Sequence, residues 1–154
     1  MNLEKKTLFV DEIKRILSEA RAQVYSAVNV AMVQAYWLIG KRIVEEEQNG
    51  AEKAKYGEKL LQTLAIELSS EFGKGFDERE LRRIRQFYLT FPIRGTLRPE
   101  LSWSHYRRLI RVTNEKARAY YLNEAANQQW SYRTLDRNCS TLYYERLFHT
   151  YYNT

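Results

Sequence analysis

The longest uninterrupted pattern in this sequence runs from Thr7 to Gln48, a stretch with no proline and a single glycine, Gly40. Mostly apolar or small side chains return every seven positions along it, in two interleaved series: Leu17, Val24, Ala31 and Leu38, and Ile13, Ala20, Ala27 and Gln34. Val28 and Ala35 widen this stripe beyond the narrow seam of a strict coiled coil. The spacing is that of a heptad repeat, and it predicts one long α-helix.

A helix of this length constrains the rest of the fold, because about forty residues with a rise of 1.5 Å each extend for about 60 Å. A domain of this size has a radius of gyration of only about 15 Å. The helix must therefore project from the domain, break, or pack on a second subunit. We expect residues 1–50 to form the dimerisation helix of a homodimer, since the small alanines of the seam permit a close approach. The alternative is a break near Asn29 or Gly40, which would give a hairpin of two helices.

Residues 51–154 are expected to form a second, helical domain, so the predicted fold class is all-α. The 154 residues include only 2 prolines and 6 glycines, which disfavours a turn-rich β fold. Asp77 and Ser131 are N-cap signals that mark the starts of helices, and Ser102 or Ser104 marks the start of another. The apolar faces that follow these caps are Leu81, Ile84, Tyr88 and Phe91; Tyr106, Leu109 and Ile110; and Leu135, Cys139 and Leu142.

The segment from Glu124 to Leu135 has the spacing of a helix-turn-helix. Ala125 is small where the two helices would meet, and Ser131 is placed to cap the second helix. Gln129 weakens the pattern, because this turn often contains glycine. The second helix of such a motif enters the major groove with its first residues, which here are Tyr132, Arg133, Thr134 and Arg137. The alternative is an ordinary helical hairpin with solvated arginines. If the domain is a winged helix, only residues 93–101 offer room for the β-hairpin that forms the wing.

The net charge of +6 is unevenly distributed along the chain. Up to Gly73 there are ten basic and eleven acidic residues, whereas from Lys74 onward there are fifteen basic and eight acidic ones. Thirteen of those fifteen are arginine, the residue that makes bidentate contacts with phosphate and guanine. We therefore expect the second half to bind a polyanion. The alternative is a charged surface that is simply solvated.

The arginine-rich helices supply the candidate DNA-binding residues. We expect phosphate contacts from Arg79, Arg82, Arg83, Arg107, Arg108 and Arg111, on the outward faces of two helices, and base contacts from Arg133, Thr134 and Arg137. Structured RNA is an alternative ligand, because it would satisfy the same cations. A protein-interaction or oligomerisation module is the alternative function, in which the arginines meet an acidic partner or keep the domain soluble.

No catalytic constellation is found in the sequence, and no metal or cofactor is expected. Glu12-Ile13-Lys14 fits a Glu-x-Lys nuclease motif formally, but it lies within the helical heptad pattern rather than on a strand. His105 and His149 are too isolated for a metal site, and Cys139 is expected to be a buried structural thiol. The chain has no run of about 18 apolar residues that could span a membrane, and no signal peptide at its start, so a cytoplasmic location is expected.

Several motifs together resemble the N-terminal domain of YhcG-type bacterial proteins. They are YWLIGKRIVEEEQNG, AKYGEKLLQTLAIELSSEFG, GKGFDERELRRIRQFYLTFP, LSWSHYRRLIRV, KARAYYLNEAANQQWSYRTLDRN and LYYERL, and they cover nearly the whole chain. The resemblance implies a helix-turn-helix-like or winged-helix-like DNA-binding module that precedes a nuclease domain of the PD-(D/E)xK superfamily. This chain stops at Thr154, soon after LYYERL, without that nuclease part. We therefore expect a non-catalytic targeting module, either an excised domain or a stand-alone relative, that works with a nuclease domain downstream or in trans.

Overall fold

A computed structural model describes residues 2–49 and 54–152, and the regular elements in these two stretches are all helices. In chain order they are α1 (Leu3–Asn49), α2 (Ala54–Phe72), α3 (Glu78–Thr90), the 3-10 helix η1 (Arg94–Thr96), α4 (Trp103–Leu109), α5 (Glu115–Asn127), α6 (Tyr132–Ser140) and α7 (Tyr143–Tyr152). The predicted all-α class, a long N-terminal helix followed by a helical domain, is confirmed. Residues 93–101 contain η1 and no strand, so this stretch forms no wing hairpin.

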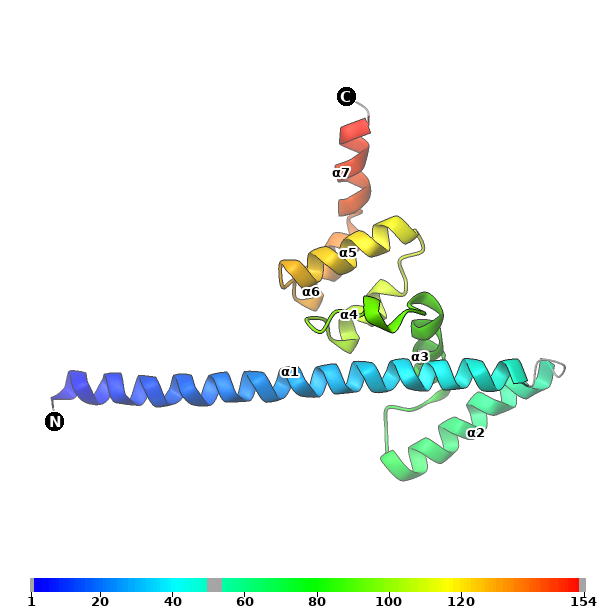
Figure 1. The fold of residues 1–154 in the computed structure, drawn as a ribbon, viewed down its shortest axis with the longest axis horizontal. Coiled ribbons are helices and arrows are strands. Elements are labelled where there is room, and N and C mark those ends of the chain that lie inside the picture. The colour runs from blue at the N-terminus through cyan, green and yellow to red at the C-terminus, as the bar shows by residue number, and fades with distance from the viewer. Residues whose placement is uncertain (1, 50–53, 153–154) are drawn as a thin grey trace.

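Helix α1 is continuous over its 47 residues and projects far beyond the other helices at its N-terminal end (Figure 1). The alternative of a break near Asn29 or Gly40 is therefore wrong. Residues 2–28 are exposed, whereas the later part of the helix packs against α3 and supplies buried residues to the core. The expected boundary between residues 1–50 and 51–154 falls at residues 50–53, outside the described part of the chain.

The close packing of α1 on α3 depends on Gly40. A Cβ atom at this position would lie 2.4 Å from the backbone oxygen of Ile84 and 3.0 Å from Cβ of Tyr88. One turn earlier in α1, Trp37 is buried and its Nε1 donates a hydrogen bond of 2.7 Å to the carbonyl oxygen of Phe91. These two contacts fix the direction of the long helix relative to the helical domain.

The core consists of two clusters of apolar side chains. The larger one joins α1 and α3 to α4, α5 and α6, and its fully buried members include Phe87, Tyr106, Tyr121 and Leu135. The smaller one joins α1, α2 and α3 through Ile43, Leu61, Ala65, Leu81 and Ile84. The inner face predicted for α3 omitted Phe87, although its side chain is completely buried, and included Tyr88, which is only half-buried.

The helix starts predicted from cap residues are confirmed. Asp77 accepts a hydrogen bond of 2.8 Å from the backbone N–H of Glu80 and so caps α3. Ser131 accepts one of 3.2 Å from the N–H of Thr134 and caps α6. Ser102 is the N-cap of α4, where it forms a reciprocal capping box with His105.

The end of α6 differs from the sequence prediction. The helix stops at Ser140, and Leu142 takes a left-handed conformation with φ of 57° before α7 begins. The prediction that Leu142 points inward with Leu135 and Cys139 is therefore wrong, because the chain leaves the helix before that turn is complete and exposes Leu142. Helix α7 is fastened to α5 instead, through a hydrogen bond of 2.9 Å from the N–H of Tyr144 to the hydroxyl of Tyr121.

Candidate nucleic-acid interface

Helices α5 and α6 are joined by a turn that has left-handed geometry at Gln129, with φ of 53°. The N–H of Trp130 donates to the carbonyl oxygen of Ala125 at 2.9 Å, which is the six-to-one hydrogen bond of a Schellman motif. Glycine is the usual residue at such a position because it has no Cβ. Gln129 therefore adopts the conformation that glycine normally supplies, and its presence does not prevent the turn.

The side chain of His105 links this turn to the start of α4 through hydrogen bonds. Its Nδ1 accepts a hydrogen bond from the N–H of Ser102 at 3.2 Å, so its Nε2 carries the proton and donates to the carbonyl oxygen of Trp130 at 2.7 Å. The imidazole is buried, and both ring nitrogens are used in these contacts. His105 thus has a structural task at the junction between the start of α4 and the start of α6.

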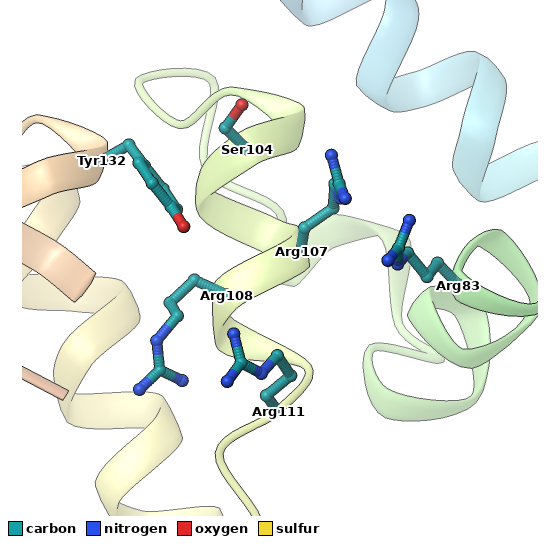
Figure 2. A pocket seen from close by; sticks show the side chains of 6 residues that line it. All are labelled: Arg83, Ser104, Arg107, Arg108, Arg111 and Tyr132. Carbon is teal, nitrogen blue, oxygen red and sulfur yellow. The ribbon is translucent and has the colours of Figure 1, made fainter. Parts of the chain in front are cut away.

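A cavity of about 260 Å³ opens where α3, α4 and α6 meet. We call it the arginine pocket, and its lining consists of Arg83, Ser104, Arg107, Arg108, Arg111 and Tyr132. Figure 2 shows Arg83 entering from α3 and Tyr132 entering from the first residue of α6, with the other side chains coming from α4 and the residues just after it. The guanidinium groups of Arg108 and Arg111 lie next to each other in this view.

The arginine pocket has an excess of positive charge. Arg83 is paired with Glu80 at 3.0 Å, and Arg108 is paired with Asp136 at 2.8 Å. Arg107 and Arg111 have no side-chain hydrogen bond or ion pair with any residue that the structure describes. Four guanidinium groups and two carboxylates leave two positive charges uncompensated, which is a favourable environment for an anion.

Arg108 was expected to face solvent together with Arg107 and Arg111, and this prediction is wrong. Its side chain is buried, and its Nε donates to Oδ1 of Asp136, which belongs to α6. Helical geometry explains the difference, because residues four apart point in nearly the same direction, whereas the residue after Arg107 is rotated by about 100°. Arg107 and Arg111 therefore share the outward face, while Arg108 is turned toward α6.

The structure separates Arg79 and Arg82 from the arginine pocket. Both line a groove between α2 and α3, and neither is among the residues that line the arginine pocket. Arg82 is also paired with Glu78 at 3.3 Å. The six arginines that the sequence grouped together as phosphate contacts thus face two different surfaces.

The three residues expected to contact bases lie on α6. Arg133 and Arg137 are exposed and, within the described part of the chain, have no side-chain hydrogen bond or ion pair. Thr134 is half-buried, and its hydroxyl accepts a hydrogen bond of 3.1 Å from the hydroxyl of Ser131, so it belongs to the cap of the helix. Tyr132 was expected at the groove-facing end of α6, and the structure places it in the wall of the arginine pocket.

Eight of the thirteen arginines after Lys74 make a side-chain hydrogen bond or ion pair with a described residue. Arg85 pairs with Glu47, Arg94 with Gln34, and Arg118 with the carbonyl oxygen of Val112. In the stretches that the structure describes, the arginines after Lys74 without a side-chain hydrogen bond or ion pair are Arg79, Arg107, Arg111, Arg133 and Arg137. All five are among the candidate residues named from the sequence. Ser104 was missed, because a serine in the first turn of a short helix carries no distinguishing signal.

Cys139 is buried, as expected, and burial raises the pKa of its thiol to about 11. A thiol that stays protonated at neutral pH is a poor nucleophile. Among the described side chains, which exclude that of His149, no three His, Cys, Asp or Glu residues are grouped so that they could hold a metal ion. None of the helices in residues 2–49 and 54–152 combines the length and the apolarity of a membrane span.

Comparison with known proteins gives one family and one curated relative. The family model described as the DUF1016 N-terminal domain matches residues 12–146. A protein of Escherichia coli (strain K12) named "Putative nuclease YhcG" is 33% identical over 168 aligned positions, which cover 88% of this chain. The same alignment covers 45% of that protein, so the chain spans less than half of its relative's length. No solved structure matches the chain.

Proposed function

Because the chain belongs to the DUF1016 N-terminal domain family, as its resemblance to YhcG-type proteins led us to expect, we propose that it is a DNA-binding module. In this proposal it performs no catalysis and delivers a YhcG-type nuclease domain to its substrate. The observation that carries the proposal is the arginine pocket, with two uncompensated positive charges beside the first turn of α6. A nuclease partner is consistent with the name of the E. coli relative, which is longer than this chain.

The geometry supports a docking mode in which α6 enters the major groove. Arg133 and Arg137 are four residues apart on α6, so both project from one face of this helix toward the base edges. Arg107 and Arg111 lie across the arginine pocket from Tyr132, the first residue of the same helix, and would contact phosphate of the bound nucleic acid. Phosphate contacts beside a recognition helix fix its position, and side chains in the groove supply specificity.

The proposal is tested by measuring the affinity for duplex DNA across a salt series. The logarithm of the association constant should fall linearly with the logarithm of salt concentration, with a slope of about −0.9 for each phosphate contacted. Arg107→Ala/Arg111→Ala should make that slope shallower by about two, because each substitution removes one phosphate-binding cation. Arg133→Ala/Arg137→Ala should weaken binding and reduce discrimination between sequences, by about 1–3 kcal/mol for each bidentate arginine–base pair that is removed.

Two controls accompany this experiment. Lys5→Ala/Arg15→Ala removes the same charge from the exposed half of α1, so it should leave the slope close to that of the wild type. Competition between duplex DNA and structured RNA distinguishes the two nucleic acids that the same cations would satisfy. Absence of binding at low salt, or binding without a salt slope, contradicts the proposal.

The exposed half of α1 favours a second function, self-association. Its heptad series presents Val10, Ile13, Leu17 and Val24 to solvent, and Phe9 and Ile16 extend the apolar face. Soluble monomers rarely expose a continuous apolar surface of this length. A second copy of α1 would cover this surface, and the resulting homodimer would present two α6 helices to paired half-sites.

Light scattering tests the self-association. The wild type should be a dimer at micromolar concentration, and Ile13→Asp/Leu17→Asp should be a folded monomer, because it introduces charges into the seam. Ser18→Asp/Ser26→Asp adds the same charges outside the seam and should leave the dimer intact. A monomeric wild type contradicts the proposal. Deletion of the whole helix is unsuitable, since Val33, Trp37 and Ile43 belong to the core.

A further inference from the structure

The shape of the arginine pocket limits the kind of phosphate that it can accept. Its walls come from three helices, α3, α4 and α6, and enclose about 260 Å³. An internal phosphate of a duplex continues into a sugar on both sides and lies on a convex surface. A group at the end of a strand projects freely and can enter a concave site. The pocket is therefore better suited to a terminal phosphate than to a phosphate within a continuous strand.

The charge and the donors of the pocket also match a terminal phosphate. A phosphomonoester carries about −1.5 to −2 charges at neutral pH and has three free oxygens, whereas an internal diester carries one charge and has two. The pocket has two uncompensated positive charges. Besides its four guanidinium groups it contains the hydroxyls of Ser104 and Tyr132, so its donors suffice for three acceptor oxygens.

Two of the four arginines are fixed before any ligand arrives. Arg108 is buried and bound through its Nε by Asp136, which leaves its terminal nitrogens for other acceptors. Arg83 is bound by Glu80, and Glu80 also accepts a hydrogen bond of 2.6 Å from Nε1 of Trp103. Arginines that are already ordered lose less conformational entropy on binding, which raises the affinity for a ligand of matching shape.

We propose that the arginine pocket is a binding site for the terminal phosphomonoester of a nucleic-acid strand. The proposal rests on the proposed DNA-binding function and narrows it to a preference for phosphorylated strand ends. The exposed ring of Tyr132, at the rim of the pocket, then lies where the terminal base could stack on it. In Figure 2 the ring of Tyr132 lies on the side of the pocket opposite Arg83.

The test uses duplexes of one sequence that differ only at their ends. One carries 5′-phosphates, one carries 3′-phosphates, one carries hydroxyls at all ends, and one is closed by a hairpin loop at each end. We expect one of the phosphorylated duplexes to bind roughly tenfold more tightly than the hydroxyl-ended duplex, because charge-assisted hydrogen bonds are added. The closed duplex should bind no better than the hydroxyl-ended one.

The variants are compared by the ratio of the two affinities, phosphorylated over hydroxyl-ended, so that effects of net charge cancel. Arg107→Gln and Arg111→Gln should reduce this ratio to about one, and both should fold because neither arginine has a partner among the described residues. Arg133→Gln removes the same charge outside the pocket. It should lower both affinities and keep the ratio.

The outcomes separate the two proposals. If all four duplexes bind the wild type equally, the end preference is refuted while DNA binding stands. If no duplex binds at low salt, DNA binding fails and the strand end is refuted as the ligand. In that case the protein is titrated with inorganic phosphate and with a deoxynucleoside 5′-monophosphate, and binding to the pocket is followed by NMR. Binding of these small molecules without binding of DNA would assign the pocket to a free phosphate compound instead.

Discussion

Gly40→Ala is the sharpest test of how the long helix is joined to the domain. The new Cβ would lie 2.4 Å from the backbone oxygen of Ile84, roughly 1 Å short of the 3.4 Å at which ordinary contact begins. Because the obstructing atom belongs to the backbone of α3, the shortfall can be relieved only by moving α1 away from α3. Overpacking of this kind costs about 1–3 kcal/mol, and a backbone obstruction places Gly40 near the upper end of that range.

The higher helix propensity of alanine partly offsets this cost, since alanine is favoured over glycine within a helix by about 1 kcal/mol. We therefore expect a net loss of roughly 2 kcal/mol in the free energy of unfolding, with the steric effect prevailing. For a chain of this size the melting temperature should fall by about 4–8 °C. Thermal and urea denaturation, followed by circular dichroism, would measure both quantities.

Gly95→Ala is the matched control, because a Cβ at Gly95 has no atom within 4 Å and the backbone there is not left-handed. Its free energy of unfolding should stay within about 0.5 kcal/mol of the wild type. A Gly40→Ala protein as stable as the wild type, or more stable, would show that α1 and α3 are not packed as described.

Two further predictions concern the turn and the buried phenol. Gln129→Gly should raise the melting temperature by a few degrees, since the left-handed conformation costs a residue with a Cβ about 1 kcal/mol. The control, Gln128→Gly, changes a residue with φ of −97° and should lower the melting temperature. The reverse order of the two melting temperatures would refute the assignment of the turn. Burial raises the pKa of Tyr106 to about 12, so the folded state holds this proton more tightly than the unfolded chain. The contribution of the protonated Tyr106 to the free energy of unfolding is fully present below about pH 10 and is lost as the pH rises toward 12. Urea midpoints between pH 8 and pH 11 should therefore fall less steeply for Tyr106→Phe than for the wild type, and equal slopes would contradict the prediction.

Features set by neighbouring residues could be predicted from the sequence. The caps at Asp77, Ser102 and Ser131 require only a side-chain oxygen and the N–H groups of the next turn, so composition and spacing reveal them. The long helix follows in the same way from an unbroken heptad pattern. The left-handed residues were not predictable, because Gln129 and Leu142 lack the compositional signal that glycine gives.

Features set by distant residues were predicted poorly. Arg108 was assigned to solvent because its partner, Asp136, is 28 residues away and belongs to another helix. Phe87 was left out of the core because the face that α3 buries depends on where α1 and α4 cross it. The arginine pocket itself could not be predicted, since its residues come together only through the angles between three helices.

The arrangement of α1 has a mechanical consequence. The C-terminal part of this helix is fixed in the core by Trp37, Gly40 and Val44. About 26 residues at its N-terminal end are exposed and extend away from the domain. At 1.5 Å per residue the free part is a rigid arm of about 40 Å. A molecule bound to the N-terminal end of this arm would be kept at a fixed distance and direction from α6. If two copies pair along their arms and bind DNA as proposed, the arms would fix the separation between the two bound DNA segments without any flexible linker.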